Sequence, residues 1–196
     1  MRKLVTLAAT LAVLVALLGT VWVVRELGKK EAEEAVLANR VATDSEAAVT
    51  ADGKVDHLKA GYAAYHSGRL VEAAAEYQIA ADEGDPVAQR NLGFLYEHGH
   101  GVNPDYLQAM AWYQKAADQG HRAAFNNIGF LYVAGLGVEQ DFVQAHYWYT
   151  KAVVAGSAEG KRLREVIRKK MTEEQIATAE KLAKDNGLKE EGVFGF

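Results

Sequence analysis

The chain has 196 residues, including 18 glycines, two prolines and no cysteine; 49% of the residues are hydrophobic and 24% are charged. This composition excludes a disordered or collagen-like chain. The lack of cysteine also excludes disulfide frameworks, thiolate metal sites and cysteine nucleophiles. A formal net charge of −4 gives no general attraction to nucleic acid. We therefore expect one large folded domain, or a small repeat array with an added segment.

An uncharged run of 21 residues, 4–24, lies near the N-terminus. A helix of this length, rising about 1.5 Å per residue, spans roughly 30 Å, which is the hydrocarbon thickness of a bilayer. A cleaved signal peptide is the alternative, but its apolar core is usually about 7–15 residues long, and no small-x-small cleavage site is visible here. We predict a cytosolic stub and an uncleaved transmembrane signal anchor within residues 1–27.

Basic residues lie on both sides of this run, so the positive-inside rule decides its orientation only narrowly. Arg2 and Lys3 precede it, whereas Arg25, Lys29 and Lys30 follow it. A basic head before the first apolar segment is the usual signal-anchor arrangement. We therefore expect a single-pass protein of the inner (cytoplasmic) membrane with the rest of the chain in the periplasm; a domain facing the cytosol is the alternative.

The next segment, residues 28–54, is a charged helix and a polar linker, and the following part of the chain repeats. Residues 85–120 align with residues 121–156 without gaps, and 17 of the 36 positions are identical. The identical positions include Asn91/Asn127, Gly93-Phe94-Leu95-Tyr96/Gly129-Phe130-Leu131-Tyr132, Gly99/Gly135, Gly101-Val102/Gly137-Val138, Asp105/Asp141, Gln108-Ala109/Gln144-Ala145, Trp112-Tyr113/Trp148-Tyr149, Lys115-Ala116/Lys151-Ala152 and Gly120/Gly156.

Each unit has the apolar spacing of two antiparallel helices. The first helix is expected to begin at Asp85-Pro86, with an N-cap followed by proline at the first helical position. Glycine inside a helix costs about 1 kcal/mol relative to alanine. Gly93 and Gly129 therefore predict close helix contacts. A glycine loop follows, and the second helix is expected to start near Asn103-Pro104 in one unit and near residues 139–141 in the next.

These residues resemble a known family. The pattern N-x-G-x-L-Y-x-x-G-x-G-V-x-x-D-x-x-Q-A-x-x-W-Y-x-K-A-A-x-x-G is similar to the Sel-like repeats (SLR), a branch of the tetratricopeptide repeats (TPR). Residues 55–84 resemble an ordinary tetratricopeptide repeat with a shorter turn. Residues 85–120 and 121–156 resemble two Sel-like repeats. Residues 157–187 resemble degenerate capping helices, the second of which opens with a capping box at residues 172–175.

The resemblance implies an all-α protein, a right-handed α-solenoid of stacked antiparallel helix pairs behind a single transmembrane helix. It also implies an adaptor that binds a partner protein or peptide on its concave surface, without chemistry or cofactors of its own. Such a protein is a scaffold; the alternative is a regulatory or stabilising subunit of a membrane enzyme or transporter complex. The resemblance is also compatible with a homo-oligomer. It does not identify the partner.

The repeat register predicts which side chains line the concave surface, where donors and aromatic rings would meet a partner. Asn91 and Asn127 recur at one repeat position, which favours a structural hydrogen bond to the neighbouring loop. Phe94 and Phe130 recur too, so packing between repeats is as good an interpretation for them as partner contact. The predicted residues are Lys59, Tyr62, Tyr65, His66, Arg90, Asn91, Phe94, Glu97, His98, Asn126, Asn127 and Phe130.

Other clusters give weaker signals. His98 and His100 beside Glu97 have a possible metal-ligand spacing, but we expect no metal site because no further ligand is fixed nearby. Residues 161–170 hold six basic side chains and one acid, which we interpret as the solvated surface of a terminal helix. No arrangement of residues predicts catalysis.

The last segment, residues 188–196, is an apolar tail. Phe194 and Phe196 could dock into a partner or into the groove of a neighbouring protomer. A frayed or self-packed end is the alternative.

Overall fold

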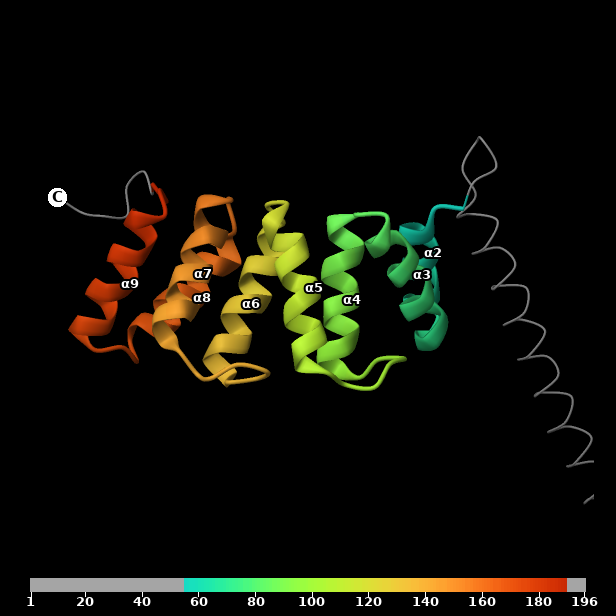
Figure 1. The fold of residues 1–196 in the computed structure, drawn as a ribbon, viewed down its shortest axis with the longest axis horizontal. Helices are drawn as coiled ribbons and strands as arrows, with labels where there is room; N and C mark the ends of the chain where they lie inside the picture. Colours follow the sequence, from blue (N-terminus) through green and yellow to red (C-terminus); the bar gives the residue numbers. More distant parts are fainter. Residues whose placement is uncertain (1–54, 190–196) are drawn as a thin grey trace, which may run out of the picture. The chain divides into compact units, whose positions relative to one another are not determined.

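The computed structural model describes residues 55–189. These residues belong to one compact unit of the chain. They form eight helices that lie side by side in one row (Figure 1). The helices are α2 (His57–His66), α3 (Leu70–Asp82), α4 (Pro86–His98), α5 (Tyr106–Asp118), α6 (Arg122–Ala134), α7 (Phe142–Val154), α8 (Ala158–Arg168) and α9 (Glu173–Asp185).

Consecutive helices pair as the repeats predict. We call α2, α4, α6 and α8 the A helices, and α3, α5, α7 and α9 the B helices. Each of the pairs α2/α3, α4/α5 and α6/α7 packs closely, and α3/α4, α5/α6 and α7/α8 join one pair to the next. The predicted all-helical solenoid is therefore confirmed for this part of the chain.

Aspartates open several of these helices. Asp85 is the N-cap of α4, and its Oδ1 accepts hydrogen bonds from the amides of Val87 and Ala88 at 2.8 Å, as the sequence predicts. The prediction for the second helix of that repeat is less accurate. α5 begins at Tyr106, not near Asn103-Pro104, because the Asp105 carboxylate caps the amides two and three residues further on.

Close contact between paired helices explains the glycines inside α2, α4 and α6. Each of these three glycines lies against a tyrosine ring of the partner B helix, and a Cβ atom there would come within 2.5–2.7 Å of ring carbon atoms. The predicted close helix contact is thus confirmed, and its partner is the same in all three pairs. The pairs are Gly61/Tyr77, Gly93/Tyr113 and Gly129/Tyr149.

The glycine loops reach back to the preceding repeat. Gly99 and Gly101 have φ angles of 68° and 76°, which side-chain-bearing residues rarely adopt. A Cβ on Gly101 would lie 2.1 Å from the carbonyl oxygen of Leu70, at the start of α3. Gly137 makes the same kind of contact with Tyr106 at the start of α5. Each loop therefore fixes the spacing between successive repeats.

The last two helices close the array. Thr172 and Gln175 form the predicted capping box, and α9 ends at Asp185. The prediction of a solvated basic surface over residues 161–170 is wrong at one position, because Arg164 is only 3% exposed. Arg164 occupies the repeat position of Ile128, a fully buried residue, and its guanidinium donates to Thr150 Oγ1 at 3.4 Å.

Several predictions lie outside the described residues. They are the anchor within residues 1–27, the linker of residues 28–54, and the phenylalanines of the tail, Phe194 and Phe196. Within residues 55–189, no helix combines the length and the apolar character needed to cross a bilayer.

Candidate functional site

A cavity of about 340 Å³ lies where α2 and α4 meet, and it gathers half of the predicted partner-binding residues. Tyr62, Tyr65 and His66 come from α2, while Arg90, Asn91 and Phe94 come from α4. The repeat register predicted these six as one surface, and the structure brings them together. Two lining residues were not predicted, Tyr77 of α3 and Leu95 of α4.

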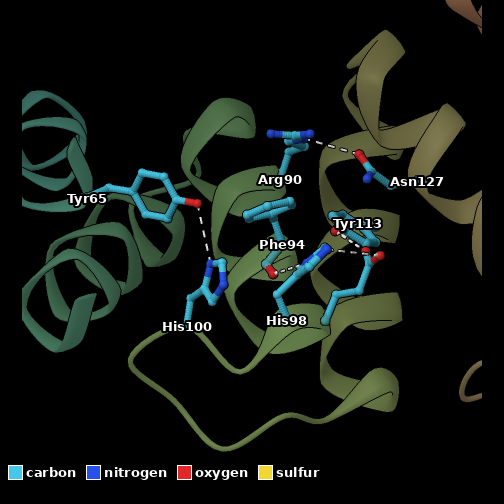
Figure 2. A network of polar contacts seen from close by, with 8 residues as sticks. Tyr65, Arg90, Phe94, His98, His100, Tyr113 and Asn127 are labelled. Carbon is cyan, nitrogen blue, oxygen red and sulfur yellow. Dashed lines mark hydrogen bonds and ion pairs between the residues drawn. The ribbon is translucent and has the colours of Figure 1, made fainter. Parts of the chain in front are cut away.

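Phe94 is the centre of an aromatic cluster beside this cavity (Figure 2). The Tyr65 ring meets it edge-on at 6.3 Å between centroids, and the His98 ring stacks on it at 4.1 Å. The Arg90 guanidinium lies 5.5 Å from its centroid. Phe94 therefore packs between repeats and remains half-buried at the cavity, which combines the two predicted interpretations.

Arg90 links two repeats. Its Nε donates to Asn127 Oδ1 at 3.1 Å (Figure 2). One terminal nitrogen donates to Asn91 Oδ1 at 3.2 Å. The prediction that the recurring asparagines bind the neighbouring loop is wrong, since both amide oxygens accept from this guanidinium. With Phe94 beneath it, the Arg90 side chain is held in place on three sides.

Asn91 and Tyr77 are the buried polar groups of the cavity. Asn91 is 8% exposed, and its Nδ2 has no hydrogen-bond partner within residues 55–189, although the Tyr77 side chain lies beside it. Burial raises the pKa of the Tyr77 phenol, so this group stays neutral over the physiological range. The cavity floor therefore carries an unsatisfied donor and no anion.

Glu97 was predicted on the binding surface, but its carboxylate points elsewhere. The Glu97 side chain is only 7% exposed and accepts a hydrogen bond from the Tyr113 hydroxyl at 2.6 Å. Burial, and then the Glu97 charge, raise the pKa of Tyr113. Glu97 thus fixes a B-helix tyrosine and does not line the cavity.

The loop histidine His100 joins the cluster, which the sequence did not predict. Its Nδ1 lies 3.4 Å from the Tyr65 hydroxyl, and its ring centroid lies 5.6 Å from that of His98. His98 Nδ1 in turn contacts the Phe94 carbonyl at 3.1 Å. Over the described range, no three His, Cys, Asp or Glu side chains are grouped to hold a metal ion.

Besides Glu97 and His98, four predicted residues lie outside the cavity. Lys59 is exposed on α2, Asn127 contacts Arg90 from α6, and Phe130 is 44% exposed. Asn126 donates to Ser157 Oγ at 3.1 Å, so it supports the start of α8. These residues all lie on A helices, but they do not form one site.

A second hollow, of about 820 Å³, lies at the glycine loop that joins α4 to α5. Its walls are loop backbone and helix ends, and the repeat register did not predict it. It is lined by Tyr96, Gly99, Gly101, Val102, Asn103, Pro104, Asp105 and Gln108.

The family model of the Sel1 repeat matches this chain twice. The matched segments are residues 86–121 and 123–156, which cover α4/α5 and α6/α7. A search of the curated proteins found no match.

Solved structures show the same fold. A protective antigen present in uropathogenic Escherichia coli strains, which displays an SLR fold, is 27% identical with a TM-score of 0.58. That comparison covers 86% of this chain and 44% of the antigen chain. A Sel1 repeat protein from Oxalobacter formigenes is 31% identical with a TM-score of 0.53, over 56% of this chain and 43% of that chain.

This chain therefore spans less than half of the length of either protein. Proteins built from Sel1 repeats are generally interaction scaffolds, and the fold is typically non-catalytic.

Proposed function

We propose that this chain is a membrane-anchored scaffold that binds a partner protein or peptide on the face formed by its A helices. The observation that carries the proposal is the cavity between α2 and α4, where exposed aromatic rings surround a fixed arginine. Tyrosine and arginine are the residue types that contribute most to binding energy at protein interfaces.

The repeat architecture favours a protein partner. Helix pairs bury their apolar faces against neighbouring pairs, which leaves one continuous face of A helices for an extended segment or helix of a partner. Tyr62 of α2 and Phe130 of α6 each follow the helix glycine, as Phe94 of α4 does, and they are exposed by 41% and 44%. Apolar contact area is therefore available beyond the cavity itself.

Membrane attachment is the second part of the proposal, and it rests on the uncharged run of residues 4–24. With the basic head in the cytosol, the repeats of a bacterial protein would lie in the periplasm, held at the inner membrane by the linker of residues 28–54. A reporter that matures in one compartment only, fused after Phe196, tests this arrangement. Activity confined to the cytosol would overturn it.

Site-specific crosslinking in membranes tests the binding face. A photoreactive residue at position 62 stands at the cavity, whereas one at position 111 stands on an exposed site of the B helix α5. We expect a discrete crosslinked partner at position 62 and none at position 111. Equal crosslinking at both positions, or none at either, contradicts the proposed face.

The tail provides a separate proposal about docking. If Phe194 and Phe196 bind a partner or a neighbouring protomer, removal of residues 192–196 will abolish co-purification and leave the melting temperature unchanged. Retained co-purification rules the tail out as a docking segment.

A further inference from the structure

We infer that the cavity between α2 and α4 selects an acidic side chain, Asp or Glu, carried by an extended segment of the partner protein. In this inference the Arg90 guanidinium binds the carboxylate of that side chain. The inference rests on the proposed function, because it assigns a chemistry to the partner that the A-helix face binds.

The charge around the cavity is the first argument. Its lining includes one permanent cation, Arg90, and no carboxylate. Glu97 lies outside this lining and accepts from Tyr113 at 2.6 Å, and Glu76 contacts His57 at 2.7 Å. An anionic group entering the cavity therefore meets a guanidinium and no lining carboxylate that would repel it.

The position of the guanidinium is the second argument. Two amide oxygens, of Asn91 and Asn127, and the ring of Phe94 orient the Arg90 side chain before any partner arrives. An arginine has five N–H donors, and these two bonds use two of them. A preoriented guanidinium with remaining donors suits a carboxylate, which accepts two parallel hydrogen bonds.

The buried amide of Asn91 is a third, independent observation. Its oxygen accepts from Arg90, so the orientation of the amide is fixed, and its Nδ2 makes no hydrogen bond of normal geometry, with the Tyr77 phenol as its neighbour. A buried donor without a well-placed acceptor costs free energy, and a bound oxygen at the cavity floor would supply one. The same oxygen would lie beside the guanidinium.

The walls of the cavity fit the rest of an acidic side chain. Tyr62 and Tyr65 present rings along α2, opposite Phe94 of α4. Methylene groups of Glu or Asp can pack on these rings while the carboxylate reaches Arg90. The next repeat lacks this chemistry, because Asn126 stands where Arg90 does and binds Ser157 instead.

Short peptides can test the inference with the full chain in detergent micelles. The probes are fluorescein-labelled Gly-Ser-Gly-Phe-Glu-Gly-Ser-amide and its matched Gln and Lys versions, followed by fluorescence anisotropy at low and moderate salt. We expect the Glu probe to bind at least about fivefold more tightly than the Gln probe, with a preference that weakens as salt rises. The Lys probe should bind most weakly.

Three variants separate the role of Arg90 from folding. R90Q should reduce the Glu preference to less than twofold, R90K should keep a weaker preference, and R122Q should leave it unchanged because Arg122 is exposed outside the cavity. Circular dichroism melts confirm that each variant is folded, and if R90Q unfolds, R90K carries the test and should reduce the preference for the Glu probe over the Gln probe.

Several results would overturn the inference. They are equal affinity for the Glu and Gln probes, no binding of any probe at a protein concentration of about 2 mM, or a preference for Glu over Gln that is unchanged in R90Q. Crosslinking at position 62 is a separate readout. If a partner is still captured there in R90Q with undiminished yield, the scaffold function stands and the acidic specificity fails.

Discussion

The two aligned repeats, residues 85–120 and 121–156, have one backbone and two different surfaces. Their four helices have 13 residues each, and the glycine–tyrosine contact and the glycine loop recur in both. Three of the differences change the polar character of the A helix and its loop. Arg90, Glu97 and His100 of the first repeat are replaced by Asn126, Val133 and Leu136 in the second.

This comparison separates scaffold from site. Identical residues close the helix pairs and give both repeats an aromatic ring on the A-helix face, at Phe94 and Phe130. The substituted position Arg90/Asn126 decides whether that face also carries charge. Exchanging aligned residues between the repeats, or making the same change in both, tests the division directly.

The pair Met110/His146 offers the largest effect. His146 is 3% exposed and neither ring nitrogen has a partner in residues 55–189; burial, followed by the charges of Arg164 and Arg168, lowers its pKa to about 4. Between pH 6.5 and 4, His146 is protonated in the unfolded chain but neutral in the folded chain. The free energy of unfolding therefore falls as the pH falls. The loss is about 3 kcal/mol.

H146M places the residue of the first repeat, Met110, at the aligned position of the second and removes the titrating imidazole. Urea unfolding at pH 7.5, 5.5 and 4 should show that the wild-type chain loses about 3 kcal/mol more than H146M. Parallel stability curves for the two proteins would mean that His146 is protonated without cost.

The glycine–tyrosine contacts come next. In G93A the added methyl group would lie 2.7 Å from the Tyr113 ring, and in G129A it would lie 2.6 Å from the Tyr149 ring. We expect G93A to cost about 2 kcal/mol, because overpacking outweighs the gain in helix propensity. G129A should cost less, since Tyr149 is not held by a carboxylate and can shift. Thermal melts that rank the two variants in the opposite order contradict this explanation.

The tyrosines themselves give a matched pair of variants. Y113F leaves the buried Glu97 carboxylate without its hydroxyl donor and should cost about 1.5 kcal/mol. Y149F should be nearly neutral, because Val133 replaces that carboxylate and Tyr149 makes no side-chain hydrogen bond within the described chain. Chemical denaturation measures both. An equal cost for the two variants would show that Glu97 contributes nothing.

The sequence alone predicts the parts of this fold that depend on local rules. The Asp85 cap, the capping box at Thr172 and the close approach at Gly93 follow from residue type and spacing, and the structure confirms all three. The predicted start of α5 is wrong by two residues. Pro104 and Asp105 each favour a helix start at their own position, and in the structure Asp105 is the N-cap.

Side-chain direction limits prediction of the site. The register places Glu97 with the other wall residues, but it cannot show that Tyr113 from the paired helix draws the carboxylate away. Tyr77 was missed for a related reason, because it reaches the cavity from a B helix past Gly61. Repetition indicates which positions share a face, whereas only the packed structure shows which of two neighbours a side chain joins.

The smallest expected effect is at the N-caps of α4 and α6. Asp85 accepts two amide hydrogen bonds at 2.8 Å, whereas His121, at the same repeat position, makes no capping bond and its Nδ1 has no partner among the described residues. Burial lowers the pKa of His121, so no charge compensates for the missing bond.

H121D should therefore raise the stability of the chain by about 1 kcal/mol, and D85A should lower it by a similar amount. Urea titration of both variants at pH 7.5 checks this symmetry. A neutral or destabilising H121D would mean that packing against the preceding repeat, and not the cap, sets the start of α6. In that case the second repeat would depend on its neighbours for local structure that the first repeat encodes by itself.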